Sequence, residues 1–384
     1  MGKKIFEVAF ATGSRADYGI VRNYINKLNA DNNINFSILA TGALLDDNFG
    51  RAIDIVKDDG FKIDHEFKTS LSQKCLGDTI HIMSEVLNDF GYYFQAHKYD
   101  LIIILGDRYE IFSIAIAAAM QRIPILHLHG GEITLANYDE FIRHSITKMS
   151  TYHITSTEIY RKRVIQLGEN PNNVFNLGAL GAENCMTIDE NNVQNEIKSL
   201  DMNTFTVLFH PETLNHVSPL MQINEVLKAV EKFISNYKFV FIGANADTSA
   251  DEITHRVKDF CNEHNNSFFF YNLHPDAYHY LVKNSIALIG NSSSGIIEVP
   301  SLNTFTINIG NRQTGRVTSS SIKTVDCVEE SIVNAIKYTI EHKNDLITDT
   351  PYYQNNSAEK YYKKTLEILH KNKTNNYKEF YDII

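Results

Sequence analysis

The chain has 384 residues, of which 43% are apolar and 21% charged, and its formal net charge is −10. This length exceeds that of a usual single hydrophobic core, so two domains are expected. The negative charge and the scattered lysines and arginines argue against a nucleic-acid partner, which requires clustered basic residues. The longest apolar region, residues 111–128, is interrupted by Gln121, Arg122 and Pro124 and is too broken to cross a bilayer.

The N-terminus and the cysteines indicate a cytoplasmic protein. The apolar run after Met1 lacks a cleavage-type segment, so a first β-strand explains it better than a signal peptide. The cysteines, Cys75, Cys185, Cys261 and Cys327, are widely spaced and form no Cys-x-x-Cys pair, which predicts neither a zinc site nor a disulfide framework. We therefore expect reduced, mostly buried thiols.

Short apolar runs alternate with amphipathic stretches in the first half of the chain. Continuous apolar strands that are each followed by a helix predict a parallel sheet covered on both faces. The expected strands are 5–11, 36–40, 101–105 and 125–128, and the expected helices are 18–28, a region after Thr41, and 109–120.

A second alternating set begins after a polar stretch, residues 187–203, which is the predicted linker because it offers little to bury. The fold class is therefore α/β, doubly wound, with two similar units in tandem. We expect a ligand between the units, at the carboxyl ends of their strands. The expected strands are 206–209, 239–242, 267–271, 286–289 and 304–309, and the expected helices are 223–233 and 251–263.

Unusual loops follow two strands of the first unit. Residues 13–17 (Gly-Ser-Arg-Ala-Asp) place Arg15 just before a helix, where it either binds a pyrophosphate oxygen or pairs with Asp17. Residues 106–108 (Gly-Asp-Arg) follow a fully apolar strand. Asp107 is there either a partly desolvated general base or the N-cap of the next helix.

A third loop, residues 127–132 (His-Leu-His-Gly-Gly-Glu), combines histidines, glycines and a carboxylate. Two histidines at i and i+2 lie on one side of a strand, but no third ligand has the spacing of a metal site. The glycines indicate close approach of the backbone to a ligand. Asp107, Glu132 and Asp139 are expected to converge on one pocket, where paired acids serve as acid and base.

The second unit contributes a serine-rich turn, residues 290–295 (Gly-Asn-Ser-Ser-Ser-Gly), between an apolar strand and a predicted helix. Such a turn presents N–H groups and hydroxyls to a phosphate, or else simply caps the helix. Glu298, one turn on, is placed to accept both hydroxyls of a ribose. His210 follows another strand as a hydrogen-bonding residue or a proton donor, and Arg312 and Arg316 add positive charge. No P-loop pattern for ATP hydrolysis is present.

Taken together, these segments resemble the UDP-N-acetylglucosamine 2-epimerase family, in particular its hydrolysing branch, which makes N-acetylmannosamine for sialic acid and bacterial surface polysaccharides. The resemblance rests on seven pieces in order through about 300 residues: 13–17, 106–108, 130–132, Asp139 with 142–145, 210–211, 290–298 and 310–313. The ordered set is far more specific than any one motif.

The resemblance implies a glycosyltransferase-B-type fold, in which two Rossmann-like domains face an interdomain cleft. Residues 1–185 would form the catalytic domain, 186–360 the UDP-binding domain, and 361–384 a C-terminal helix and tail that pack back on the first domain. The implied reaction eliminates UDP to a 2-acetamidoglucal and then adds water, with no cofactor and no metal. The resemblance implies that UDP is held by Arg15, His210, Ser292, Ser293, Glu298 and Arg312 and that Asp107 and Asp139 act at the sugar. With the residues singled out above, the expected catalytic residues are Asp107, Glu132, Asp139 and His210, and the expected UDP- and sugar-binding residues are Arg15, His129, Arg143, Ser292, Ser293, Ser294, Gly295, Glu298, Arg312 and Arg316.

One position departs from the family pattern. Many relatives have a glutamate where this chain has His129, so the acid role falls on Glu132 or is shared differently.

Several readings remain open within this fold. The sugar is either that of UDP-N-acetylglucosamine or that of UDP-N,N′-diacetylbacillosamine. The non-hydrolysing epimerases match residues 130–132 and 142–145 less well. A UDP-sugar glycosyltransferase would share the fold, and a catalytically inactive nucleotide-sugar sensor would share the binding residues, although the retained Asp107 and Asp139 argue against it. The resemblance also implies a homodimer or a homotetramer.

Overall fold

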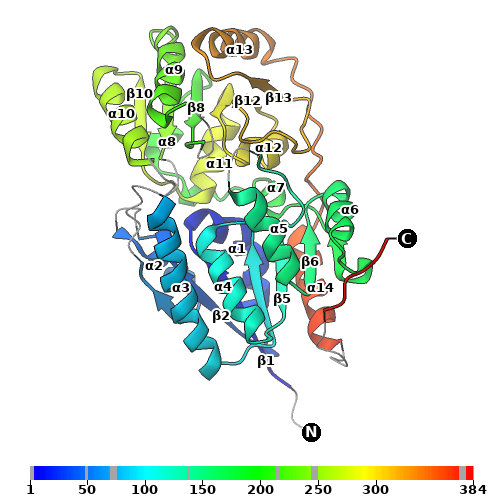
Figure 1. The fold of residues 1–384 in the computed structure, drawn as a ribbon. Coiled ribbons are helices and arrows are strands. Elements are labelled where there is room, and N and C mark those ends of the chain that lie inside the picture. The colour runs from blue at the N-terminus through cyan, green and yellow to red at the C-terminus, as the bar shows by residue number, and fades with distance from the viewer. Residues whose placement is uncertain are drawn as a thin grey trace. The chain divides into compact units, whose positions relative to one another are not determined.

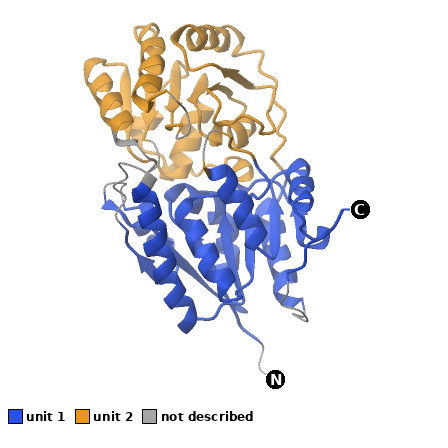
Figure 2. Cartoon of the chain, viewed as in Figure 1, with its two compact units in different colours: residues 1–132, 139–180, 354–384 blue, residues 133–138, 181–353 orange. Residues whose placement is uncertain are grey.

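The computed structural model describes residues 4–47, 51–69, 76–135, 138–212, 217–243, 250–371 and 378–383. The chain forms two compact units, shown in different colours in Figure 2. Unit 1 consists of residues 1–132, 139–180 and 354–384, and unit 2 consists of residues 133–138 and 181–353. The chain thus passes from unit 1 to unit 2 after residue 180 and returns to unit 1 at Gln354. From the sequence we expected these changes after residues 185 and 360. We did not expect the excursion segment, residues 133–138, to belong to unit 2.

Unit 1 contains a seven-stranded parallel sheet with the strand order β3-β2-β1-β4-β5-β6-β7. Most of its strands are buried and rich in apolar residues because helices cover both faces. The strands are β1 (Phe6–Thr12), β2 (Ile34–Thr41), β3 (Ile63–Phe67), β4 (Leu101–Leu105), β5 (Ile125–Leu128), β6 (Tyr152–Thr155) and β7 (Val174–Asn176).

The helices of unit 1 lie on both faces of this sheet (Figure 1). Helix α1 shows why they form: Ser14 caps it by accepting the backbone N–H of Asp17, and Tyr18, Val21 and Ile25 make a buried stripe at helical spacing. Helix α4 is apolar all round because it lies between α3 and α5. The helices are α1 (Arg15–Asn29), α2 (Ile53–Asp58), α3 (Leu76–Ala96), α4 (Tyr109–Met120), α5 (Asp139–Met149), α6 (Glu158–Gln166) and α14 (Ser357–His370).

The last long helix, α14, returns to unit 1 and packs against α1. The Tyr24 and Thr365 hydroxyls are 2.6 Å apart, and the rings of Tyr24 and Tyr361 meet edge to face. Tyr361 is fully buried and donates a hydrogen bond to the Gly178 carbonyl at 2.6 Å. The C-terminal helix is therefore part of the core of unit 1.

Unit 2 contains a six-stranded parallel sheet with the order β10-β9-β8-β11-β12-β13. Alternate side chains of its strands enter two separate cores, since Phe239 and Phe241 pack with α9, α10 and α13, whereas Val240 and Ile242 pack with α11. The strands are β8 (Thr204–Leu208), β9 (Lys238–Ile242), β10 (Ser267–Phe270), β11 (Ala287–Gly290), β12 (Phe305–Ile309) and β13 (Ile322–Val325). The helices are α8 (Asn195–Lys198), α9 (Pro219–Glu231), α10 (Ala250–Glu263), α11 (Pro275–Lys283), α12 (Ser294–Ile297) and α13 (Glu329–His342), and α7 (Leu180–Asn184) begins where the chain changes unit.

Two sequence expectations are corrected by this fold. The predicted linker 187–203 is part of unit 2, because Val193 and Ile197 are buried in its core next to α11. The prediction of mostly buried thiols holds for Cys185, whereas Cys261 and Cys327 are half-buried and free. Cys75 lies outside the described residues.

Candidate functional site

Each sheet places two of the unusual loops at the point where its strand order reverses. In unit 1, β1 pairs in parallel with β4, so residues 13–17 and 106–108 leave the sheet side by side. In unit 2, β8 pairs in parallel with β11, so His210 and the serine-rich turn 290–295 leave the sheet side by side. Such reversal points, at the carboxyl ends of the strands, are where open α/β sheets bind ligands.

The serine-rich turn starts at a position that requires glycine. Gly290 has φ +147°, and a Cβ atom there would lie 1.9 Å from the Leu208 carbonyl oxygen. The end of β11 can therefore approach the end of β8 only without a side chain at this position. This contact brings the backbone of the turn next to His210.

Asn291 joins the loops of unit 2. Its Oδ1 accepts the backbone N–H of His210 at 2.7 Å, and its Nδ2 donates to the carbonyl of His210 at 2.8 Å. The Asn291 carbonyl accepts hydrogen bonds from Arg312 Nη1 at 3.1 Å and from Gln313 Nε2 at 2.7 Å. Asn291 is fully buried, and its hydrogen bonds connect the loops after β8, β11 and β12. It was not among the predicted site residues, although its place beside Gly290 was a signal.

Glu212 is a second brace that the sequence analysis did not identify as such. Its Oε1 accepts the backbone N–H groups of Asn311 at 2.9 Å and Arg312 at 3.0 Å, and only 4% of the residue is exposed. A buried carboxylate that accepts two N–H groups fixes the loop that carries them. Arg312 is thus held through its backbone by Glu212 and through its guanidinium by Asn291.

The helix expected after the serine-rich turn is only one turn long. Helix α12 spans Ser294–Ile297, and Ser293 makes no side-chain cap, so neither a long helix dipole nor serine capping explains the turn. The hydroxyl of Ser292 instead accepts the Ser294 N–H at 3.4 Å. The Ser294 hydroxyl donates to Glu298 Oε2 at 2.7 Å.

Glu298 is held in a hydrogen-bonded cluster of unit 2. Besides the Ser294 hydroxyl, its Oε2 has His279 Nε2 at 3.3 Å, and the Tyr278 hydroxyl donates to Ser294 at 2.9 Å. Arg316 lies apart from these contacts: its Nε donates to the Ile133 carbonyl at 3.0 Å. The structure therefore groups His210, the serine-rich turn and Arg312, and it directs Arg316 to the excursion segment.

In unit 1, the loop after β1 carries charged groups in a buried setting. Burial lowers the pKa of Arg15 to about 10, which leaves the guanidinium charged at neutral pH. Burial raises the pKa of Asp17 to about 6, although the positive charge of Arg108 acts in the opposite direction. Arg108 Nε also donates to Glu110 Oε1 at 2.6 Å, and Glu110 is 1% exposed. This reversal point thus concentrates cations and acids.

Asp107 pairs with a fully buried arginine. Its Oδ2 contacts Arg143 Nη2 in an ion pair, and Arg143 is 1% exposed. Arg143 Nη1 donates to the Glu132 carbonyl at 2.9 Å and lies 3.6 Å from Glu140. Asp107 is not a helix N-cap, because α4 begins after Arg108 without a side-chain cap. Arg143 of α5 therefore joins the loops after β4 and β5.

His129 and Glu132 form a second pair in the loop after β5. His129 Nδ1 lies 3.1 Å from Glu132 Oε1, which also accepts the Ser156 hydroxyl at 2.7 Å. His129 is 7% exposed, has φ +64°, and its Nε2 is buried without a hydrogen-bond partner among the residues described. His127 is different, because its ring bonds the Gly106 carbonyl at 2.8 Å and Thr147 at 3.1 Å, and burial lowers its pKa to about 3. Glu132 Oε1 thus contacts His129 and Ser156, and Asp107 Oδ2 contacts Arg143.

Asp139 is the first residue of α5, one helical turn before Arg143, and is half-buried. Within the described ranges, no group of three or more His, Cys, Asp and Glu side chains is arranged to hold a metal ion. In the same part of the chain, none of the helices combines the length and apolar character needed to span a membrane.

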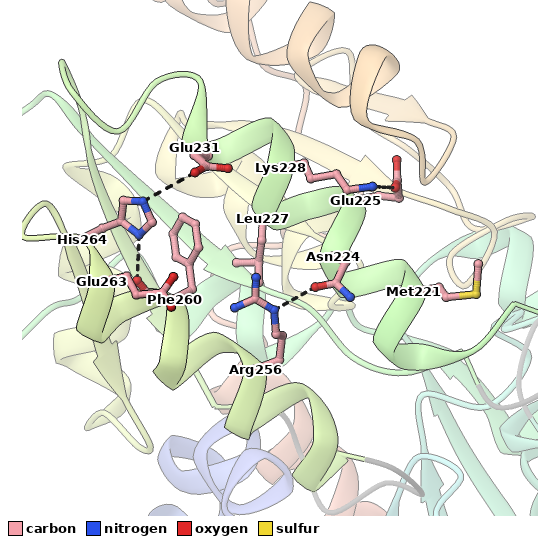
Figure 3. Close-up of a pocket in the computed structure, with 10 residues that line it drawn as sticks. All are labelled: Met221, Asn224, Glu225, Leu227, Lys228, Glu231, Arg256, Phe260, Glu263 and His264. Atoms are coloured by element: carbon pink, nitrogen blue, oxygen red, sulfur yellow. Dashed lines mark hydrogen bonds and ion pairs between the residues drawn. The ribbon is translucent and has the colours of Figure 1, made fainter.

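A pocket of about 270 Å³ lies elsewhere in unit 2, between α9 and α10 (Figure 3). Arg256 Nε donates to Asn224 Oδ1 at 2.9 Å at its centre, and Lys228 and Glu225 pair at 2.7 Å on its rim. None of the predicted site residues lines it. We therefore assign the pocket no part in the candidate site.

The protein is thus a two-unit α/β protein of the glycosyltransferase-B type, with charged and hydrogen-bonding loops at the reversal point of each parallel sheet. A solved structure of UDP-GlcNAc 2-epimerase from Neisseria meningitidis bound to UDP-GlcNAc has a similar fold, with a TM-score of 0.77, 16% identity and coverage of 94% of this chain and 100% of that one.

The family is established by sequence. The family model for UDP-N-acetylglucosamine 2-epimerase matches residues 26–366, and the chain belongs to this family. It is 45% identical to the polysialic acid biosynthesis protein P7 of Escherichia coli over 98% of this chain and 97% of that protein. It is also 35% identical to a GDP/UDP-N,N′-diacetylbacillosamine 2-epimerase (hydrolyzing) of Campylobacter jejuni, over 82% and 83% of the two chains.

Proposed function

We propose that this protein is a hydrolysing UDP-N-acetylglucosamine 2-epimerase, which converts UDP-N-acetylglucosamine and water to UDP and N-acetylmannosamine. The observation that carries the proposal is that unit 1 holds two charged pairs, Asp107 with Arg143 and His129 with Glu132, to which we assign the two proton transfers. The likeness to a polysialic acid biosynthesis protein supports this product, because N-acetylmannosamine is the sugar from which sialic acid is made.

The chemistry requires departure of UDP before inversion at C2. The C2 proton of an N-acetyl sugar is not acidic, so a carboxylate base alone would remove it slowly. When the C1–O bond to UDP breaks, positive charge develops at C1 and the C2 proton becomes removable. The products of this step are UDP and 2-acetamidoglucal. Water then adds its hydroxyl to C1, and a proton is delivered to C2 from the opposite face.

The groups of unit 2 suit the departing diphosphate. We assign the backbone and hydroxyls of Ser292, Ser293, Ser294 and Gly295, together with Arg312 and His210, to UDP, and Glu298 to the ribose. Arg15 of unit 1 and Arg316 add positive charge to the diphosphate in this proposal. Because Asn291 and Glu212 brace the loops in advance, the donors need little rearrangement when charge develops.

The groups of unit 1 suit the two proton transfers. Asp107 contacts the Arg143 guanidinium, and a positive charge beside a carboxyl group favours its ionised form, which a general base at C2 requires. His129 contacts Glu132 through Nδ1, and its Nε2 has no hydrogen-bond partner in the described part of the chain. We assign to Nε2 the proton exchange on the other side of the sugar. Asp139 of α5 also acts at the sugar. In this way His129 fulfils the role of the glutamate found in many relatives.

One experiment tests the whole proposal: proton NMR of the purified protein in D₂O with UDP-N-acetylglucosamine. The expected products are free UDP and N-acetylmannosamine that carries deuterium at C2. A UDP-linked epimer would instead indicate a non-hydrolysing enzyme, and inertness without an added acceptor would indicate a glycosyltransferase.

A second candidate has its own support, the 35% identity to the Campylobacter jejuni enzyme. UDP-N,N′-diacetylbacillosamine would use the same UDP-binding groups and differ only at the sugar. A parallel NMR experiment with that nucleotide sugar separates the two candidates, because turnover of this substrate alone would replace the first proposal.

A further inference from the structure

The C-terminal segment of the chain, residues 378–383, lies against the end of helix α5 in unit 1. Lys378 Nζ donates to the carbonyls of Thr147 at 3.0 Å, Lys148 at 2.7 Å and Ser150 at 2.5 Å. These carbonyls belong to the last residues of α5 and the residue after it, and the Thr147 carbonyl also accepts the Ser150 N–H at 3.2 Å. The ammonium group of Lys378 therefore caps the negative end of the helix.

The same ammonium group reaches a buried acid. Lys378 Nζ lies 2.8 Å from Glu169 Oε2, and Glu169 is 3% exposed. Glu169 also accepts Lys148 Nζ at 2.7 Å and His153 Nε2 at 3.0 Å. Two cations and a buried imidazole thus surround a single carboxylate. Removal of Lys378 would leave the acid and the helix end with a missing partner.

The neighbouring residues fix the place of this segment. The Phe380 ring lies beneath Lys148 Nζ, which is 4.9 Å from the ring centroid. A Cβ atom on Gly168 would lie 2.3 Å from the Phe380 ring, so the ring occupies the space that the glycine leaves open. The Tyr381 N–H donates to the Gly168 carbonyl at 2.9 Å. The segment is therefore held by contact of the Phe380 ring with Gly168, by the hydrogen bond of the Tyr381 N–H and by the ion pair of Lys378 with the buried Glu169.

Helix α5 connects this seat to the proposed reaction. Its first residue is Asp139, and Arg143, one turn later, pairs with Asp107 and donates to the Glu132 carbonyl. A short rigid helix transmits a displacement at one end to side chains at the other. We propose that Lys378 is a positioning residue: it anchors the C-terminal end of α5 and thereby holds Arg143 and Asp139 in place for the proton transfers. This inference rests on the function proposed above.

The test compares full-length variants. Lys378→Met removes the charge and keeps most of the side-chain length, Lys378→Arg restores the charge, and Lys371→Met is the matched control, because Lys371 is exposed at the end of α14. For Lys378→Met we expect kcat for UDP release to fall roughly tenfold. KM and the Kd for UDP should change by less than about twofold, because most of the proposed UDP-binding residues are in unit 2. Lys378→Arg should recover activity to within about threefold of the parent.

A second readout does not depend on turnover. Hydrogen exchange of the α5 amides should become roughly tenfold faster in Lys378→Met and should stay unchanged in Lys371→Met. Parent protein that turns over no UDP-sugar would overturn the proposed function, and the exchange data would still decide whether Lys378 anchors α5. Active parent protein with unchanged kcat and unchanged α5 exchange in Lys378→Met would overturn the inference itself.

Two further outcomes concern the stability and the folding of Lys378→Met. If kcat per folded molecule stayed constant while the melting temperature dropped, Lys378 would be structural only and the inference would be wrong. If Lys378→Met did not fold, Phe380→Ala would take its place, because it loosens the seat and leaves the charge. A fall in kcat with unchanged KM would then support the anchoring role, and an unchanged kcat would overturn it.

Discussion

Asn291 and His210 exchange a reciprocal pair of hydrogen bonds at 2.7 Å and 2.8 Å, between the amide side chain of one residue and the backbone of the other. The pair lies just beyond the ends of β8 and β11, where the parallel ladder stops at Leu208 and Gly290. The Asn291 side chain replaces the backbone hydrogen bonds that the next residue of β11 would have made, and it bonds both the N–H and the carbonyl of the buried His210. The loops proposed to bind UDP are in this way fixed before any ligand arrives.

Asn291→Ala should weaken both folding and UDP binding. The substitution removes both hydrogen bonds that Asn291 makes with the buried backbone of His210, so we expect the free energy of unfolding to fall by about 2–3 kcal/mol. We also expect the Kd for UDP to rise roughly tenfold, since the loops of His210 and Arg312 lose their common brace. Calorimetry with UDP and urea unfolding measure the two effects. The exposed Asn195→Ala is the control, and an equal change in both variants would contradict the role of Asn291.

Asp107→Asn should abolish chemistry and spare binding. The amide keeps the size of the carboxylate but cannot accept a proton, so kcat should fall roughly 10²- to 10⁴-fold. The Kd for UDP should stay within about threefold, because most of the UDP-binding residues that we propose are in the other unit. Initial rates of UDP release and calorimetry provide the data, with the exposed Asp345→Asn as control. A variant with near-normal kcat would remove Asp107 from the catalytic residues.

The His129→Glu variant should be more active than the His129→Ala variant. His129→Ala removes the proton-transfer group and leaves Glu132 with one partner fewer, so we expect a loss of roughly 100-fold or more in kcat. His129→Glu supplies the residue found in many relatives and should retain more activity than the alanine variant. Deuterium incorporation at C2, followed by NMR, reports on this step directly. Near-parent activity of His129→Ala would show that residue 129 transfers no proton.

The acid stability of unit 1 should depend on Glu169. Burial by itself raises the pKa of this carboxyl, but His153, Lys148 and Lys378 outweigh that effect and lower the pKa to about 2. Because the folded pKa lies below the ordinary 4.5, the stabilisation is complete above about pH 5 and is lost as the pH falls from 4.5 towards 2. It amounts to on the order of 3 kcal/mol.

The measurement is urea unfolding of the parent, Glu169→Gln and the control Glu158→Gln between pH 7 and pH 3.5. The difference in unfolding free energy between parent and Glu169→Gln should be constant near neutrality and should shrink in acid. Glu158 is an exposed partner of Arg161, so its substitution should give a small, flat difference. A difference for Glu169→Gln that is independent of pH would disprove the ionic role.

Several elements of the fold could be predicted from local sequence. Strands β4 and β5 and helix α4 have the predicted bounds, because each is a continuous apolar or amphipathic run; β4 ends at Gly106 and β5 begins after Pro124. The alternation of strands and helices also predicted two parallel α/β units, which is confirmed. Strands β3 and β13, which lie at the sheet edges and are only partly buried, have weak apolar patterns and were not predicted.

The candidate site was predictable as a set of loops but not as a set of contacts. Residue types and their position after strands predicted that Arg15 and Asp107 lie at strand ends of unit 1, and that His210 and the serine-rich turn lie at strand ends of unit 2. The tertiary structure decided which strands are neighbours, and hence that β1 meets β4 and β8 meets β11. It also decided that Arg143 pairs with Asp107 and that Lys378 caps α5. These contacts join residues far apart in the chain, and their geometry comes from packing and from the need to satisfy buried charges, for which a local pattern carries no signal.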